Sequence, residues 1–245
     1  VAGAAMRGLR TDTNIDTISG LVFNAWGDRS FDAPYGVWFD GDWDKPRLDD
    51  PAIQKGLSDY AGLMQAGPSD ILSYNWNEAG NAFCNGQAAF FADASLFGPW
   101  FETDDCPISK GNTGYMALPP QDKGGTSYTA NWQWGIGMGA NAQEKDAGWY
   151  FIQYMTNKAS EAVIGTFHGG AGRLSTWEND SYTSTLNPDY VSATLESMKT
   201  VRTSVVPVKD FNKYALEIMD VILDIHGGAS SEDATAKGNA NFKAM

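Results

Sequence analysis

The chain has 245 residues and a formal net charge of −13, with 17 Lys and Arg against 30 Asp and Glu. Hydrophobic residues make up 42% of the chain and charged residues 19%, which is typical of a globular protein and not of a disordered one. Nucleic acid and anionic lipid attract cations and repel carboxylates, so this charge argues against both as partners. No apolar run approaches the roughly 18 residues that a membrane span requires.

The first half of the chain predicts two strands and two helices. Val1–Arg10 lacks the basic-then-apolar order of a signal peptide and is instead typical of the middle of a strand. A helix is expected from Asp50 to Ala66, where Asp50 supplies a cap, Pro51 takes the first helical position and the apolar residues share one face. A shorter helix follows from Asn77 to Asn85. Gln87–Asp93 is an apolar run, expected to be a buried strand that delivers Asp93 to a surface.

The second half is predicted to be mainly helical. A loop rich in Pro, Gly, Ser and Thr is expected from Pro119 to Thr129, followed by a strand from Ala130 to Met138 in which Trp132, Trp134 and Ile136 share one side. Further elements are an aromatic amphipathic helix at Lys145–Thr156, an irregular glycine-rich crossing at His168–Arg173, and closing helices near Pro188–Thr200, Phe211–His226 and Ser231–Ala244. Few strands spread among many helices indicate an α/β fold.

The sequence gives no positive evidence for an enzyme, a cofactor or a metal. It has two histidines, and it has neither a G-x-S-x-G nucleophile motif nor a papain-like cysteine signature. Gly135–Gly139 lacks the spacing of a dinucleotide-binding loop. The acidic run Asp40–Asp44 opens like a calcium loop, but Lys45 and Pro51 stand where such a loop needs Gly and Glu. We therefore interpret the run as a solvated loop before a helix.

Several side chains have two interpretations on spacing alone. Arg173 could donate to vicinal hydroxyls from a glycine-rich crossing, or it could bridge two surface segments. Trp132 and Trp134 could form a stacking platform, although one of them is expected in the core. Cys84 and Cys106 could form a disulfide in an oxidising compartment or remain free thiols in the cytosol.

Taken in order, several segments resemble one protein family. The helix-to-strand passage Asn81–Ser95, the strand ending in Leu-Pro at Gly114–Pro119, Asn131–Ile136 with Asp146–Ile152, and Gly169–Ser175 resemble motifs of the extracellular solute-binding proteins of ABC importers, in the maltose- and polyol-binding class. Each motif is weak by itself, but their order extends over nearly the whole chain. At Gly172 the chain departs from the proline or alanine that is usual nearby in the family.

The resemblance implies a periplasmic-binding-protein-like α/β fold of type II, with two lobes that close on a ligand. Met6-Arg7-Gly8 resembles a strand well inside the second lobe, so we expect this chain to lack most of the N-terminal lobe. Residues 1–130 would then form the first part of the second lobe, 131–170 a segment that crosses into the first lobe, and 171–245 the closing helices of the second lobe.

The resemblance also implies a function without catalysis. The protein would capture a sugar or sugar alcohol for an ABC permease, as a monomer, in the periplasm or lipid-anchored outside a Gram-positive cell. The alternatives are a glycoside-processing enzyme, which needs two facing carboxylates, and a stand-alone carbohydrate-binding module. Export would also permit a Cys84–Cys106 disulfide. The ligand-binding residues implied by matched position are Arg7, Asp93, Trp132 and Arg173, with Trp76 and Ser95 as further candidates.

Overall fold

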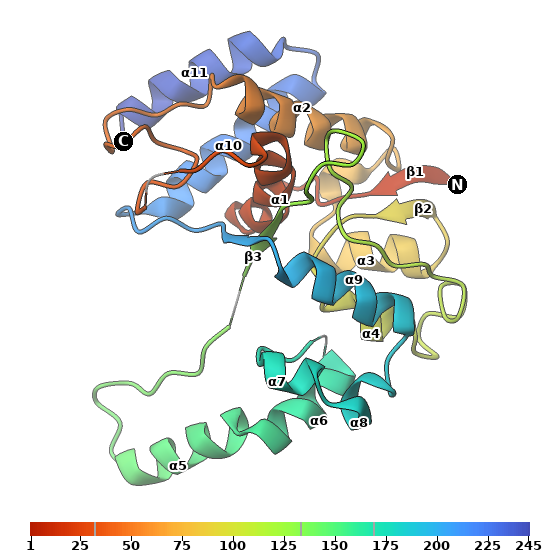
Figure 1. Cartoon of the computed structure of the whole chain (residues 1–245). Helices are drawn as coiled ribbons and strands as arrows, with labels where there is room; N and C mark the ends of the chain where they lie inside the picture. Colours follow the sequence, from red (N-terminus) through yellow and green to blue (C-terminus); the bar gives the residue numbers. More distant parts are fainter. Residues whose placement is uncertain (32, 133, 169) are drawn as a thin grey trace. The chain divides into compact units, whose positions relative to one another are not determined.

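The computed structural model describes residues 1–31, 33–132, 134–168 and 170–245. It divides the chain into two compact units, each made of segments that are separate in the sequence. Unit 1 comprises Val1–Asp93, Ala117–Trp132 and Glu196–Met245, and unit 2 comprises Ala94–Met116 and Gln133–Leu195 (Figure 1).

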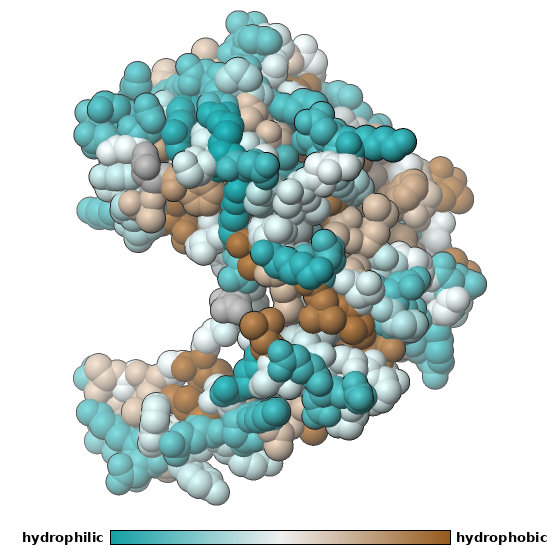
Figure 2. All heavy atoms as spheres, viewed as in Figure 1, coloured by the Kyte–Doolittle hydropathy of each residue, from teal (hydrophilic) through white to brown (hydrophobic). Residues whose placement is uncertain are grey.

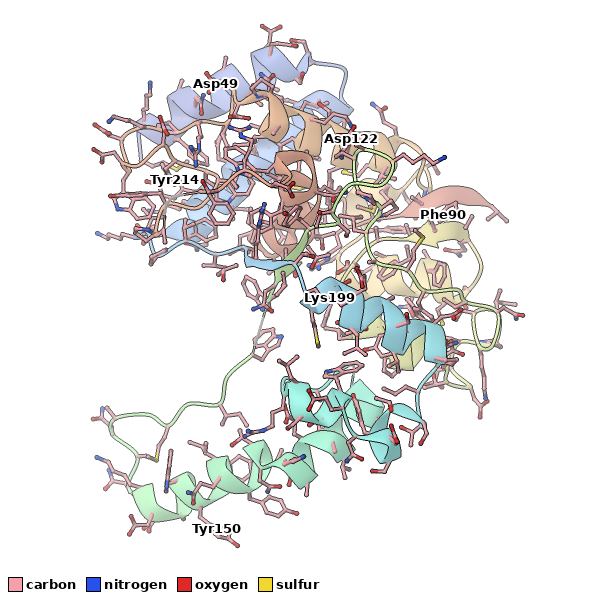
Figure 3. All side chains as sticks on the ribbon, viewed as in Figure 1. Asp49, Phe90, Asp122, Tyr150, Lys199 and Tyr214 are labelled. Carbon is pink, nitrogen blue, oxygen red and sulfur yellow. The ribbon has the colours of Figure 1, made fainter. Side chains whose placement is uncertain are left out.

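One parallel strand pair of unit 1 joins the beginning of the chain to the segment before Asp93. β1 (Ala2–Ala5) runs parallel to β2 (Ala88–Phe91), so the strands expected in these two segments are confirmed. The predicted burial of β2 is wrong, because Phe90 is 70% exposed and projects outward (Figure 3). Successive side chains of a strand point to opposite faces, and one face of this two-stranded sheet is open at Phe90.

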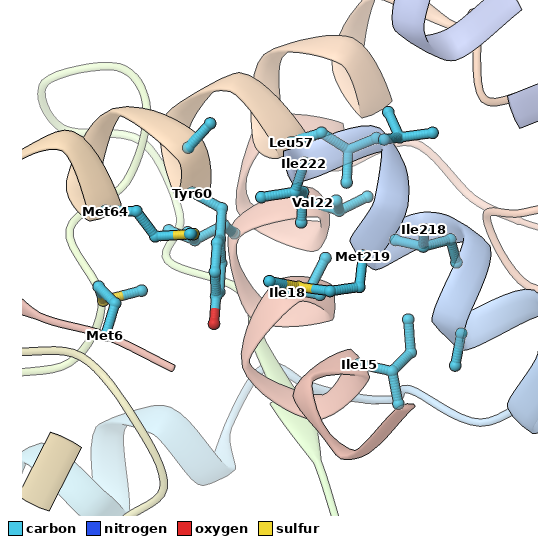
Figure 4. Close-up of a cluster of buried hydrophobic side chains, with 14 of the residues drawn as sticks. Met6, Ile15, Ile18, Val22, Leu57, Tyr60, Met64, Ile218, Met219 and Ile222 are labelled. Carbon is cyan, nitrogen blue, oxygen red and sulfur yellow. The ribbon is translucent and has the colours of Figure 1, made fainter. Parts of the chain in front are cut away.

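The core of unit 1 lies among three helices, α1 (Ile15–Trp26), α2 (Pro51–Gln65) and α10 (Phe211–His226) (Figure 4). Each helix repeats apolar residues every three or four positions, which gathers them on one face. Complete burial of each such side chain stabilises the fold by about 1.5–3 kcal/mol. Core side chains with no exposed surface include Ile18, Val22, Ile53, Leu57, Tyr60, Ile218, Met219 and Ile222.

Helices α1 and α2 approach each other closely at a glycine. A Cβ atom at Gly56 of α2 would lie 2.6 Å from the Cα atom of Val22 in α1, closer than real Cβ contacts. Gly62, six residues further along the same helix, has no atom within 4 Å of its Cβ position. Gly56 therefore permits the contact between the helices, whereas Gly62 has no such role.

The helix termini of unit 1 follow the capping residues in the sequence. The Asp50 side chain accepts a hydrogen bond of 2.9 Å from the Ala52 N–H, and Pro51 takes the first position of α2, so this prediction is confirmed. The predicted helix at Phe211–His226 is α10 with the same bounds. The last helix, α11 (Ser231–Lys243), begins after Ser230, whose hydroxyl accepts from the N–H of Asp233.

A second parallel pair joins β3 (Thr129–Asn131) to β4 (Val201–Thr203). The predicted strand over 130–138 is wrong in length, since residues 134–139 have no regular secondary structure; residue 133 lies outside the described residues. The strand ends where its pairing with β4 ends. Trp134 is 83% exposed and Trp132 is 44% exposed, so the expectation that one of them is a core residue is also wrong.

Unit 2 is helical. Its core is aromatic, with Phe97, Phe101, Trp177, Tyr182 and Tyr190 buried. The elements are α4 (Phe97–Phe101), α5 (Lys145–Thr156), α6 (Lys158–His168), α7 (Leu174–Trp177), α8 (Asp180–Thr183) and α9 (Pro188–Met198).

The predicted helix at 145–156 is confirmed as α5, but its apolar face is not buried in this structure. No residue of α5 is buried, and Tyr150 projects outward (Figure 3). Of the predicted irregular crossing at 168–173, residues 170–173 have no helix or strand, as expected, but residue 168 is the last residue of α6, so the prediction is wrong there; residue 169 lies outside the described residues.

The viewed surface over α2 and α11 is mainly hydrophilic (Figure 2). None of the described helices combines the length and the apolar character that a membrane crossing requires.

The remaining elements of unit 1 are η1 (Asp12–Asn14), η2 (Ile71–Ser73) and α3 (Trp76–Cys84).

Candidate ligand-binding site

Arg7 and Asp93 form a buried ion pair just beyond the ends of β1 and β2. Arg7 Nε donates to Asp93 Oδ2 at 2.6 Å, and Nη2 donates to Oδ1 at 2.5 Å. The Arg7 side chain is 3% exposed and the Asp93 side chain 0%. The expectation that the strand delivers Asp93 to a surface is wrong in this structure, because the guanidinium covers both carboxylate oxygens. Two of the predicted ligand-binding residues are thus brought together, by direct contact.

The same guanidinium contacts the beginning of α1. Arg7 Nη1 donates to the Thr13 carbonyl oxygen at 3.0 Å, and Nη2 donates to Thr17 Oγ1 at 2.9 Å and Asp16 Oδ2 at 3.1 Å. From α2, the Tyr60 hydroxyl donates to the Arg7 carbonyl oxygen at 2.8 Å. Arg7 therefore connects both strand ends to the first turn of α1.

Asp16 is the carboxylate of this cluster that solvent reaches. Its side chain is 18% exposed, and Oδ1 accepts from the Thr17 N–H at 2.7 Å. Burial, with a contribution from the Asp93 charge, raises the pKa of Asp16; Arg7 and the Thr17 N–H oppose this rise but do not cancel it. One guanidinium thus serves two carboxylates, and with both ionised the cluster has a net negative charge.

Trp132 follows the strand that runs along α1. The Tyr128 N–H donates to Asn24 Oδ1 at 3.2 Å, and the Ala130 nitrogen lies 3.8 Å from the Cβ position of Gly20. Two residues of a strand span about 6.7 Å, and four residues of a helix span about 6 Å. Two residues forward along β3 therefore correspond to about one turn backward along α1. Trp132 is the next residue after β3, and it is 44% exposed.

The other three predicted ligand-binding residues are Trp76, Ser95 and Arg173. Trp76 begins α3, two residues after Tyr74, whose carbonyl oxygen accepts from the Leu9 N–H at 2.9 Å. Ser95 is exposed and belongs to unit 2. Arg173 also belongs to unit 2, where its Nε lies 3.0 Å from Glu161 Oε2 and its Nη2 donates to the Thr156 carbonyl oxygen at 2.7 Å.

The two cysteines and the potential metal ligands complete the chemistry of the chain. Cys84 and Cys106 are buried, and both are disulfide-bonded. Among the described residues, no group of three His, Cys, Asp or Glu side chains is arranged to hold a metal ion.

Two hollows lie outside this cluster. One, of about 500 Å³, is lined by Trp43, Tyr214 and Phe242 of unit 1, and the other, of about 250 Å³, lies around Glu102 and Tyr190 of unit 2. Neither includes any of the six predicted ligand-binding residues. Their shape alone does not identify a ligand, so the charged cluster remains the stronger candidate.

Comparison with known proteins identifies the family. Residues 12–162 match the profile of the bacterial extracellular solute-binding proteins, which is more than half of the chain. The chain belongs to this family. It is therefore a member of a family of solute-binding proteins and not of an enzyme family.

Individual relatives agree with this family. The mannitol-binding protein of Pseudomonas aeruginosa is 28% identical over 190 residues, which cover 74% of this chain and 40% of that protein. A solved solute-binding protein of an Agrobacterium vitis ABC transporter, with bound D-mannitol, superposes with a TM-score of 0.79 at 20% identity, covering 100% of this chain and 60% of that one. Maltose-bound T. maritima MalE3 gives 0.80 at 19% identity, covering 99% and 60%.

These superpositions establish a mixed α/β fold of the type II periplasmic-binding-protein kind, as predicted. The chain spans 40% of the length of the curated relative and about 60% of the length of the solved structures. Most of the predicted strands and helices therefore have counterparts in one larger fold.

Sequence reasoning missed Asp16 and Thr17 because it missed α1. The signal was present: Thr11 caps a short turn, and Ile15, Ile18 and Val22 follow at helical spacing. A helix beginning there places Asp16 in its first turn, only a few residues after Arg7 in the sequence.

Proposed function

We propose that this solute-binding protein captures a polyol or sugar and delivers it to the permease of an ABC importer. The observation that carries the proposal is the Arg7–Asp93–Asp16 cluster, with excess carboxylate, in the same unit as the exposed Trp132. Carboxylates accept hydrogen bonds from ligand hydroxyls, and an exposed indole face stacks on the C–H face of a sugar or polyol. Sites of this kind combine aromatic faces with a few placed polar groups.

The charge of the site favours a neutral ligand over an anion. The cluster has two carboxylates for one guanidinium, and the chain as a whole has a charge of −13. An anionic solute would be repelled by both. Mannitol is named in one relative and bound in one solved structure, which supports a sugar alcohol as the first ligand to test.

We also propose that residues 131–170 pack against the part of the fold that this chain does not include. The solved structures are longer than the chain, and α5 has no buried residue although its sequence is rich in aromatic side chains. Residues 1–130 and 171–245 would then form one lobe, and the ligand would lie between the lobes.

The family description supports a location outside the cytoplasm, and the proposal extends this to the periplasm or to a lipid-anchored form on a Gram-positive cell. A single copy of the protein would present the loaded ligand to the permease. Ser95, Trp76 and Arg173 remain proposed ligand contacts alongside Arg7, Asp93 and Trp132.

The test is a calorimetric titration of the full-length gene product with mannitol, ribitol, maltose and glucose. Binding to the native state alone raises stability by about 2.7 kcal/mol at a hundred-fold excess of ligand over Kd, so thermal shifts provide a second readout. We expect one polyol or sugar to bind and Trp132→Ala to weaken it roughly ten-fold, in line with the loss of about 1.4 kcal/mol of stacking.

Trp43→Ala, at the hollow of unit 1 that lies outside the cluster, is the matched tryptophan control and should leave Kd close to the wild-type value. If no carbohydrate in the panel binds, the proposed function is wrong. If the protein consumes an aryl glycoside, the enzyme alternative replaces it.

A further inference from the structure

We propose that Asp16 is the ligand-facing carboxylate of this site and that the Arg7–Asp93 pair is its support. The inference rests on the proposed function and deepens it by identifying which acidic group contacts the hydroxyls. The ligand group it would bind is a neutral vicinal diol, such as a sugar or sugar alcohol presents.

Access distinguishes the two carboxylates. The Asp93 side chain has no exposed surface, and both of its oxygens already accept from Arg7. Asp16 accepts from Nη2 of the same guanidinium, and its side chain is 18% exposed. A ligand can therefore contact Asp16 without displacing any residue, whereas a contact with Asp93 first requires Arg7 to move.

The hydrogen bonds of Asp16 leave room for a ligand. Oδ1 accepts from the Thr17 N–H, with Thr17 Oγ1 at 3.4 Å, and Oδ2 accepts from Arg7 Nη2. An ionised carboxylate offers about four acceptor positions, more than these contacts occupy, and the group is partly exposed to solvent. Two adjacent hydroxyls could occupy the remaining positions, while Arg7 holds the carboxylate in place.

The electrostatic surroundings of Asp16 disfavour its charged form. Arg7, after β1, is the cation that faces Asp16; Asp93, after β2, repels it, and Tyr60 of α2 lies within the same cluster. Arg7 already has a counter-ion in Asp93, so a second carboxylate adds charge without pairing a free cation. Burial and the Asp93 charge raise the pKa of Asp16, so the ionised form is disfavoured in the folded protein. Ionisable groups whose pKa is shifted by burial and by a neighbouring charge are frequent at functional sites.

The linkage between protonation and folding gives Asp16 a testable signature. Well below the ordinary aspartate pKa of about 3.9, the carboxyl is neutral in both the folded and the unfolded protein. As the pH rises from there through the raised pKa, the unfolded state releases its proton more readily, so wild-type protein loses stability relative to Asp16→Asn. A residue that only supports the fold would show the opposite result, since its replacement would lower stability at pH 7.

The experiment measures the Kd for mannitol and the unfolding midpoint of three forms of the full-length gene product: wild type, Asp16→Asn and Asp12→Asn. Asp12 lies four residues earlier, has no ion pair among the described contacts, and is the matched control for loss of one charge. We expect Asp16→Asn to weaken binding at least ten-fold while its unfolding midpoint at pH 7 equals or exceeds that of wild type. Asp12→Asn should retain the wild-type Kd.

The outcomes separate this inference from the proposed function. If wild type binds a polyol or sugar and Asp16→Asn binds it equally well, the inference is overturned and the proposed function stands. Weakened binding with a lowered midpoint, or an equal loss in Asp12→Asn, also overturns it. If wild type binds no carbohydrate and a cationic solute binds instead, both the function and the diol assignment are wrong.

Discussion

Replacing Arg7 with methionine tests whether the buried ion pair holds unit 1 together. Methionine retains much of the apolar stem of arginine but removes its five hydrogen bonds, two of which go to Asp93. The Asp93 carboxylate, with no exposed surface, would then lose its cation, and solvent could not replace it without a local rearrangement.

The expected loss follows from this burial. Removing one partner of a buried ion pair costs about 3–5 kcal/mol, because the other charge remains buried and unpaired. A domain has a total unfolding free energy of roughly 5–15 kcal/mol, so this variant would lose a large part of its stability. Arg7→Met combined with Asp93→Leu should recover most of the loss, since a well-packed apolar pair often replaces a buried ion pair at little cost.

The control is Arg10→Met, in a pair of the same geometry at the surface. Arg10 Nε and Nη2 donate to the two Asp220 oxygens at 2.5 and 2.6 Å, but the Arg10 side chain is 52% exposed. Exposed pairs contribute about 0–1 kcal/mol, so this variant should unfold close to wild type in urea, followed by far-UV circular dichroism. A loss below about 1 kcal/mol for Arg7→Met, or equal losses for both variants, would refute the reasoning.

Three further predictions concern the fold. Replacing Cys84 and Cys106 by serine together should lower the unfolding free energy by about 3 kcal/mol, because the disulfide restricts the unfolded chain; an unchanged urea midpoint would contradict this. Gly56→Ala should destabilise by about 1–3 kcal/mol through overpacking, whereas Gly62→Ala in the same helix should stabilise by about 0.5–1 kcal/mol; equal effects would show that the helices do not touch there. Ser230→Ala should cost about 1 kcal/mol in thermal unfolding by removing the cap of α11, and no change would count against that cap.

Local sequence signals predicted the helices whose ends carry a capping residue or whose apolar period is long. Helix α2 has both features and α10 has the long apolar period, and the bounds of both agree with the prediction to within one residue. The strand over 130–138 was overestimated because alternation cannot show where a partner strand ends. Here β4 ends the pairing at Asn131, and Trp134 is exposed beyond it.

The site was predicted in part. The family resemblance selected Arg7 and Asp93, and the structure brings them together, but sequence could not show that each would cover the other. That result depends on a contact between residues 86 positions apart. Asp16 was missed for a different reason, since α1 was not predicted and no other signal marks a single carboxylate among 30 acidic residues.

The first turn of α1 carries Asp16, the ligand contact inferred above, while the rest of the helix is one of the most deeply buried elements in unit 1. Nine of its residues are buried, among them Ile18 and Val22 against α2 and α10. A ligand held at this turn would be held by the core itself, so its occupancy should slow amide hydrogen exchange along all of α1 as well as at the turn. Ligand binding and the stability of the hydrophobic core would then be coupled, and a substitution that weakens the core would also weaken ligand binding.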